Sequence, residues 1–93
     1  MTIFSKDPDA ILDYTINWDD GYLENGESIT ASSWSSYPTG LTLSATTHTT
    51  GTATVTVSGG IHAVTYVINN HVVTSKNGRE DERSITLRIW EPL

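Results

Sequence analysis

The feature that most constrains the fold of this chain is the dipeptide Asn77-Gly78, which stands between two segments rich in β-branched residues. Asn-Gly is typical of a two-residue β-hairpin turn, so residues 63–75 and 79–90 are expected to pair as antiparallel strands. If both residues are central in the turn, the register is fixed, and the hydrophobic residues of each strand share one face. The expected cross-strand pairs are Lys76 with Arg79, Ile68 with Leu87, and Tyr66 with Ile89.

Further alternating segments precede this hairpin. In residues 11–18, apolar and polar residues alternate with the period of two that is typical of a half-buried strand. Three more strands are expected at residues 27–34, 41–46 and 52–58. In the first of these, Ile29 and Ala31 are expected to face inward. Trp34 has the opposite parity, so it requires either a bulge or a position on the outer face.

Six or seven short strands without a helical segment predict an all-β protein, an immunoglobulin-like antiparallel β-sandwich of about seven strands. Tyr66 opens the penultimate strand, where such sandwiches have a tyrosine corner. A partly open barrel has much the same sequence pattern. The 93 residues suffice for one domain. We divide them into an N-terminal arm or edge strand at residues 1–10 and a single β-sandwich domain at residues 11–93.

Composition and charge exclude several partners. The chain carries 11 acidic and 5 basic residues, a net charge of −6, whereas a nucleic-acid-binding protein needs clustered Lys and Arg. No segment approaches the roughly 20 apolar residues of a membrane helix, so neither nucleic acid nor membrane is expected as a partner. The chain has no cysteine, and its first nine residues have no apolar signal core. We therefore expect folding in a reducing cytosol.

The residues that could carry chemistry do not form a recognisable catalytic or metal-binding motif. His48, His62 and His71 lack the spacing of a zinc pair on one element, and no nucleophile elbow surrounds any serine. The prediction is therefore a protein without catalytic residues, metal site or cofactor, and not an enzyme. Calcium in acidic loops stays open as an alternative, because calcium prefers several oxygen ligands. The candidate ligands are Asp7, Asp9, Asp19, Asp20, Glu24 and Glu27.

Five apolar or aromatic residues are candidates for contacts with a partner. Ile3 and Phe4 have few local partners, so their segment is either an edge strand or an arm that adds to a neighbour's sheet. Trp90 has the parity opposite to the hydrophobic face of its strand, and an exposed tryptophan either packs on its own chain or anchors a partner. Trp34 directly precedes the turn expected at residues 35–40, and Tyr37 lies in that turn. The charged run Arg79–Arg83 either keeps an edge soluble or serves as a docking tip.

Several segments together resemble a known family. They are Lys6-Asp-Pro-Asp-Ala-Ile-Leu-Asp-Tyr-Thr-Ile-Asn-Trp18, Ile29-Thr-Ala-Ser-Ser-Trp34, Gly40-Leu-Thr-Leu43, Thr54-Val-Thr-Val-Ser-Gly-Gly60, Tyr66 and Gly78-Arg-Glu-Asp-Glu-Arg-Ser-Ile-Thr-Leu-Arg88. This pattern is similar to small virion proteins of tailed bacteriophages, the phage fiber-tail adaptor proteins. The resemblance implies a structural role in the virion, with no catalysis and no cofactor. It also implies synthesis and assembly in the host cytoplasm.

Two classes of function follow. The leading hypothesis is a bacteriophage virion structural protein, present in many symmetric copies, that joins tail or fiber components. In a close variant it is a capsid cement or decoration protein, and its partners are tail, fiber or capsid proteins. The other class is a carbohydrate- or cell-surface-binding module that stacks sugars on Trp34, Tyr37 or Trp90. Exposed Trp34 and Tyr37 side by side would favour that second class.

Overall fold

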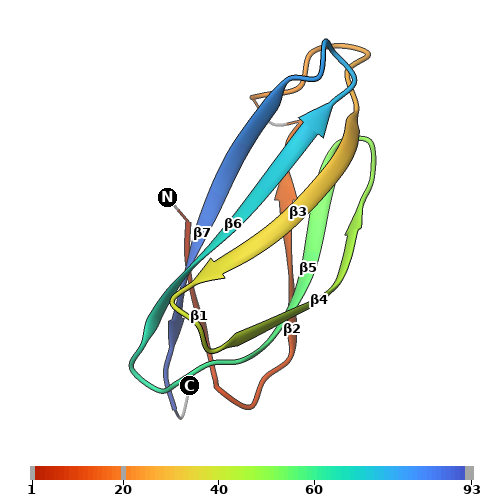
Figure 1. The fold of residues 1–93 in the computed structure, drawn as a ribbon. Coiled ribbons are helices and arrows are strands. Elements are labelled where there is room, and N and C mark those ends of the chain that lie inside the picture. Colours follow the sequence, from red (N-terminus) through yellow and green to blue (C-terminus); the bar gives the residue numbers. More distant parts are fainter. Residues whose placement is uncertain (1, 20, 92–93) are drawn as a thin grey trace.

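The computed structural model describes residues 2–19 and 21–91, which form seven β-strands in two sheets (Figure 1). The strands are β1 (Thr2–Lys6), β2 (Leu12–Asn17), β3 (Ile29–Tyr37), β4 (Leu41–His48), β5 (Thr52–Gly59), β6 (Thr65–Thr74) and β7 (Glu80–Ile89). Within these described ranges, no helix is long and apolar enough to cross a membrane.

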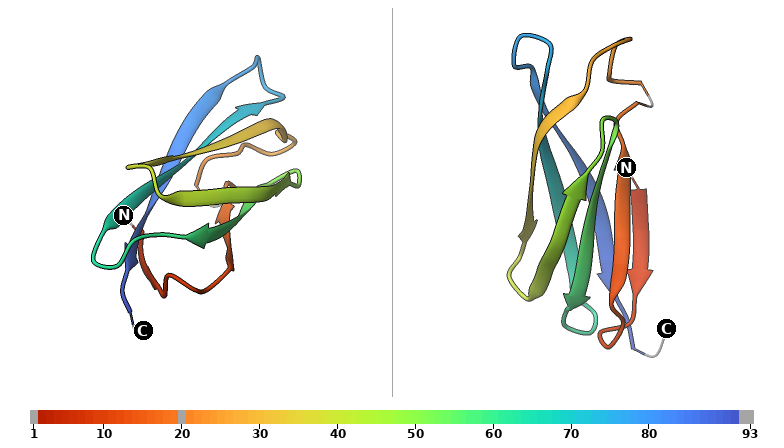
Figure 2. Two further views of the ribbon diagram at one scale, coloured as in Figure 1. Left: turned by 60° about the horizontal axis from the view of Figure 1, so that its bottom comes forward. Right: turned by 90° about the vertical axis from the view of Figure 1, so that its right-hand side faces the viewer.

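The two sheets face each other as a sandwich, which confirms the predicted all-β fold (Figure 2). One sheet has the order β1-β7-β6-β3 and the other the order β2-β5-β4. This order places the third, sixth and seventh strands in one sheet and the second, fourth and fifth in the other, as in the CFG and BED sheets of an immunoglobulin sandwich. The first strand differs from the expected antiparallel pattern, because β1 runs parallel to β7.

The core lies between the sheets and contains the residues that the period of two turns inward. Buried and half-buried residues alternate over residues 52–58 of β5 and residues 66–74 of β6. The outer face of the three-stranded sheet carries threonines instead, and the Thr15 and Thr54 hydroxyls form a hydrogen bond across β2 and β5 at 2.8 Å. The buried hydrophobic residues are Tyr14, Ile16, Trp18, Ile29, Ala53, Val55, Val57, Tyr66, Ile68, Val72, Ile85, Leu87 and Ile89.

The β6–β7 hairpin has a different register from the predicted one. Ile68 pairs with Ile85, so the prediction was wrong by two residues. The Thr74 N–H donates to Arg79 O at 2.8 Å, so the strands are joined by a four-residue turn, residues 75–78, and not by the predicted two-residue turn. Ser75 bonds to Ser28 instead, with its N–H donating to Ser28 O at 2.8 Å and its hydroxyl accepting from Ser28 N at 3.0 Å. The two predicted turn residues do have positive φ angles, 57° and 64°. A shift of two residues leaves the side-chain faces unchanged, so the predicted inward faces are correct.

A bulge determines which face of β3 is buried. The β3–β6 register shifts between Ile29 and Ala31, and one residue is left unpaired there. Beyond the bulge the parity is reversed, so Trp34 faces the core and Ala31 is exposed. The inward position predicted for Ala31 was therefore wrong, and the bulge, one of the two explanations considered for Trp34, is correct.

Tyr66 forms the predicted tyrosine corner. Its ring is fully buried at the start of β6, and its hydroxyl accepts a hydrogen bond from the backbone N–H of Ile61 at 3.1 Å. Gly40 has a φ of 137° and lies so close that a Cβ there would collide with the Tyr66 side chain. The corner thus ties the β5–β6 connection and the β3–β4 turn to the core.

Candidate interaction surfaces

Exposed hydrophobic side chains gather toward one end of the elongated sandwich, which measures 44 × 23 × 18 Å. This end, where β2 begins and β3, β5 and β7 finish, lies at the bottom of Figure 1, and we call it the apolar end. Tyr37 is 77% exposed there and Ile11 70%. Among the described residues, the large exposed hydrophobics are Ile3, Phe4, Ile11, Leu12, Tyr37, Ile61 and Trp90. Ile3 and Phe4 pair with Thr86 and Leu87, in the half of β7 nearer to this end, and the other five lie at a strand end or in a connection there.

Trp90 is held in place at the apolar end although 48% of its surface is exposed. Its ring lies against the ring of His62, with centroids 4.6 Å apart. Its backbone N–H donates to Lys6 O at 3.0 Å, and the next residue, Glu91, donates its N–H to His62 Nδ1 at 2.9 Å. A side chain fixed in this way loses little conformational entropy when a partner covers it, which favours its use as an anchor.

A buried lysine fixes the end of β1. Lys6 Nζ donates to Gly59 O at 2.7 Å, to Asp7 O at 2.8 Å and to Pro8 O at 3.5 Å. Burial lowers the pKa of Lys6, and the carboxylates of Asp7 and Asp9 act in the opposite direction. Residues 2–6 therefore lie as an edge strand on β7 of their own chain, anchored at the Lys6 end.

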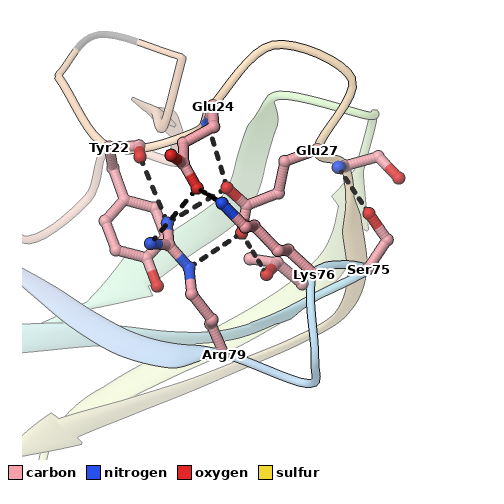
Figure 3. Close-up of polar contacts among 8 residues, drawn as sticks. Tyr22, Glu24, Glu27, Ser75, Lys76 and Arg79 are labelled. Carbon is pink, nitrogen blue, oxygen red and sulfur yellow. Dashed lines mark hydrogen bonds and ion pairs between the residues drawn. The ribbon is translucent and has the colours of Figure 1, made fainter.

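The opposite end, at the top of Figure 1, contains the β2–β3 loop, the β4–β5 turn and the tip of the β6–β7 hairpin; we call it the charged end. At its centre lies Glu27, whose side chain is 1% exposed. The Glu27 carboxylate accepts hydrogen bonds from Arg79 Nε and Nη2 at 3.0 Å each, from Glu24 N at 2.9 Å and from the Thr74 hydroxyl (Figure 3). These bonds, first among them the one from Glu24 N–H, lower the pKa of Glu27.

Two further contacts of charged side chains join the loops of this end. Lys76 forms an ion pair with Glu24, and the Arg79 guanidinium lies 4.8 Å from the centre of the Tyr22 ring. The β2–β3 loop is thus tied to the hairpin tip by residues about 50 positions apart in sequence. Within residues 2–19 and 21–91, no group of three or more His, Asp or Glu side chains is arranged to hold a metal ion. Asp20, one of the candidate calcium ligands, lies outside the described residues.

On the outer face of the four-stranded sheet, His71 lies between two carboxylates. Its Nε2 is 2.8 Å from a Glu80 carboxylate oxygen, and its Nδ1 is 3.3 Å from one of Glu82. The hydrogen bonds to Glu80 and then Glu82 raise the pKa of His71. The protonated imidazole neutralises part of the negative charge of β7.

The comparison with protein families gives a match over most of the chain. The model described as "Podophage GP4 fiber-tail adaptor protein gp77" covers residues 6–88 of the 93-residue chain. The chain belongs to this family. The predicted resemblance is confirmed, and the family is one of phage tail structural components. A search of curated proteins finds no match.

The candidate partner-binding residues differ in whether they lie within the span matched by the adaptor family and in the face of the sheet that they occupy. Trp34 and Tyr37 fall within the matched span, whereas Ile3, Phe4 and Trp90 lie outside it. Tyr37 and Ile3 belong to one row across the outer face of the four-stranded sheet, because the pairs Ile3–Thr86, Thr86–Val67 and Val67–Tyr37 are continuous. Phe4 faces the other way, with its ring centroid 5.1 Å from that of Tyr14.

Trp34 does not join these exposed residues. It is half-buried against the core, and its Nε1 is buried without a hydrogen-bond partner among the described residues. Trp34 and Tyr37 therefore point to opposite faces of β3. This arrangement lacks the exposed aromatic pair that would favour sugar binding.

Sequence reasoning missed Ile11, Leu12 and Ile61 as exposed residues of the apolar end. A signal for Ile61 was present in its position directly after Gly59-Gly60, since an apolar residue in a turn has no strand face on which to be buried. Leu12 was assigned to the inward pattern of its strand, and Ile11 was considered only as the first residue of that segment. The first buried residue of that pattern is Tyr14, because β2 extends past the core at this end.

Proposed function

We propose that this chain is a small immunoglobulin-like module that joins tail and fiber components of a phage virion and is present there in several copies. The observation that carries the proposal is the gathering of exposed hydrophobic side chains at the apolar end. Soluble monomers rarely expose several large apolar residues together, and such patches mark interaction sites. Because the chain belongs to a fiber-tail adaptor family, the partners proposed for this surface are other proteins of the virion.

The apolar end has the composition of a protein-binding surface. Trp90 and Tyr37 are of the residue types that dominate interface energetics, and Ile61 and Ile11 add exposed apolar area at the same end. Both termini of the sandwich, through β1 and Trp90, contribute to this surface. Docking would bury these side chains against a tail or fiber protein. Of the five predicted partner-binding residues, all except Trp34 have exposed side chains that could take part.

The proposal includes a structural and not an enzymatic role. It also places the protein in the virion after assembly in the host cytoplasm, with no nucleic acid, membrane or cofactor as a partner. Repetition in several copies fits a module of this size, because virion joints are built by symmetry from small identical parts. The tail adaptor family favours the tail over the capsid as the location.

Mass spectrometry of intact purified particles tests this function. We expect the protein in a fixed ratio to the tail or fiber proteins, with cross-links that start from lysine or carboxylate side chains near the apolar end. Lys6 is buried, so Asp9 and Glu91 are the suitable attachment points. Absence of the protein from the particles would overturn the proposal, and cross-links to capsid proteins alone would replace the tail joint by capsid decoration.

A further inference from the structure

The edges of the two sheets differ in how they are protected against pairing with another strand. On one side of the sandwich, the edge strand β3 has a bulge between Ile29 and Ala31. Its neighbour in the other sheet, β4, has an irregularity between Ser44 and Thr47, where Ala45 has a φ of 48°. Bulges of this kind interrupt the row of free backbone groups and discourage the addition of a further strand.

The other side of the sandwich has regular edges. β1 pairs only with residues Ile85–Ile89 of β7, so the first half of β7, Glu80–Ser84, has no strand on that side among the described residues. β2 is the adjacent edge of the second sheet, and its register with β5 is continuous from Leu12 to Asn17. The open edge of β7 at Glu80–Ser84 and the edge of β2 are therefore both uninterrupted, and they face the same side of the molecule.

A cleft of about 240 Å³ opens between these two edges. Three of its lining residues, Phe4, Ile16 and Ile85, are apolar, and the others are polar. Arg83 contributes to the cleft with its guanidinium 4.6 Å from the centre of the Trp18 ring and with Nη1 donating to Asn17 O at 3.0 Å. The full lining is Phe4, Thr15, Ile16, Asn17, Arg83, Ser84 and Ile85.

We propose that the edge Glu80–Ser84 binds an extended, basic segment of a second virion protein, which adds as a strand beyond the start of β1. This inference rests on the proposed adaptor function, because a joint needs a second surface besides the apolar end. β1 shows that the same edge of β7 accepts a strand. Strand addition gives affinity through backbone hydrogen bonds and specificity through alternate side chains.

The charge of the edge selects a basic occupant over a second copy of this chain. Residues 80–84 carry three carboxylates and one guanidinium, and the chain as a whole has a net charge of −6. Antiparallel self-pairing about the centre of this segment would place Glu82 opposite Glu82 of the second copy, and like charges directly opposite are destabilising. A segment with Lys or Arg at alternate positions would instead lie beside Glu80 and Glu82, while its remaining side chains enter the cleft near Ile85.

The test uses a soluble probe and the complete chain. A capped ten-residue peptide of alternating lysine and valine is titrated into the isotopically labelled protein, and the backbone amide signals are followed by NMR. We expect shifts confined to residues 80–85 and to β2, and slower exchange of the β7 amides that face the open edge. A peptide of alternating glutamate and valine is the matched control and is expected to give no shifts at equal concentration.

Charge-reversal variants locate the site. The double variant Glu80→Lys/Glu82→Lys is expected to weaken binding of the lysine peptide by at least about tenfold. Asp9→Lys/Glu91→Lys, with the same change of net charge at the apolar end, is expected to leave the affinity within about twofold. If loss of the His71 contacts unfolds the first variant, Glu80→Gln/Glu82→Gln replaces it, with an expected loss of about threefold.

Shifts centred away from β7, or equal weakening by both double variants, would overturn the proposed edge. Equal binding of the lysine and glutamate peptides would overturn the basic occupant. Because the titration requires no virion, it separates this proposal from the adaptor function. If the protein is found in particles but its β7 amides do not respond to the lysine peptide, only the proposed binding edge is overturned. If the β7 amides respond but the protein is absent from particles, the binding edge is supported and the adaptor function is overturned.

Discussion

The two ends of this sandwich differ in whether the chain itself covers and compensates their charged or apolar side chains. At the charged end, Glu27 is buried and receives hydrogen bonds from Arg79, Thr74 and the backbone of Glu24, so its charge is compensated within the chain. At the apolar end, Trp90 and Ile61 stay 48% and 59% exposed with little of the chain to cover them. The first end compensates its buried charge within the chain, and the second leaves large apolar side chains exposed.

The difference suggests that the charged end contributes mainly to folding and the apolar end mainly to docking. Buried, paired charges are costly to disturb, because removing one partner leaves the other desolvated and alone. Exposed apolar residues contribute little to folding and much to association. Changes at the charged end should therefore act mainly on stability, and changes at the apolar end mainly on assembly.

The largest effect is expected from removing the buried carboxylate at the charged end. Glu27→Ala leaves the Arg79 guanidinium and the Glu24 N–H without their acceptor, and we expect Tm to fall by about 10 °C or more. Glu24→Gln, at a half-exposed carboxylate in the same loop, is the matched control and should change Tm by less than about 3 °C. Thermal unfolding followed by circular dichroism measures both. Equal shifts would show that burial of the charge is not what stabilises this end.

A smaller effect is expected at the tyrosine corner near the apolar end. Tyr66→Phe removes the hydroxyl that accepts the Ile61 N–H, and we expect a loss of about 1–2 kcal/mol in the free energy of unfolding. Tyr37→Phe deletes the same atom from an exposed ring and should leave stability unchanged. Urea denaturation gives both values. If Tyr66→Phe leaves the free energy of unfolding unchanged, the hydroxyl of the corner does not contribute to stability.

The pH dependence of Tm should reflect the charged half of the molecule. The pKa of Glu27 lies below its ordinary value of 4.5, so its stabilisation is complete above pH 4.5 and is lost as the pH falls through the folded-state pKa. The pKa of His71 lies above its ordinary value of 6.5, so its stabilisation is complete below pH 6.5 and is lost as the pH rises through the folded-state pKa.

We therefore expect the highest Tm between pH 4.5 and 6.5. The decline above this window should be a few degrees at most and should be reduced in His71→Gln, because Glu80 and Glu82 then have no imidazolium to pair with. Calorimetric scans across the pH range measure it. An unchanged decline in His71→Gln would assign it to other groups.

The smallest effect on stability is expected from the apolar end itself. Ile61→Ser alters a side chain that is 59% exposed, and we expect a change within about 0.5 kcal/mol in the free energy of unfolding. Urea denaturation is again sufficient. A large loss would show that Ile61 belongs to the core and would remove it from the proposed surface.

The fold was predictable from the sequence where local pattern and burial agree. Alternation predicted the inward faces of β2, β5, β6 and β7, though not that of β3, and Tyr66 predicted the corner. The register of the β6–β7 hairpin was not predictable from its turn, because Asn77 and Gly78 adopt positive φ angles inside a four-residue turn that closes at Thr74 and Arg79. The parallel position of β1 likewise depends on the burial of Lys6, whose acceptor on Gly59 lies 53 residues away.

The interaction surfaces were predictable only in part, for the same reason. Trp90, Tyr37, Ile3 and Phe4 were selected because apolar residues with few local partners stand out in a sequence. Trp34 met the same criterion, but a bulge turned it toward the core. The open edge of β7 has no sequence signal, since it results from β1 being shorter than β7 and not from any residue type.

The most direct test of the account is whether the apolar end is needed for incorporation into particles. Cells infected with phage lacking the native protein would express either Ile61→Ser/Trp90→Ser or the control Val73→Ser, a half-buried position on the outer face of β6. Mass spectrometry of the purified particles then measures each variant. We predict that the double variant folds with nearly unchanged Tm and is missing from the particles, while the control is incorporated normally. Incorporation of the folded double variant at the level of the unmodified protein would contradict the account.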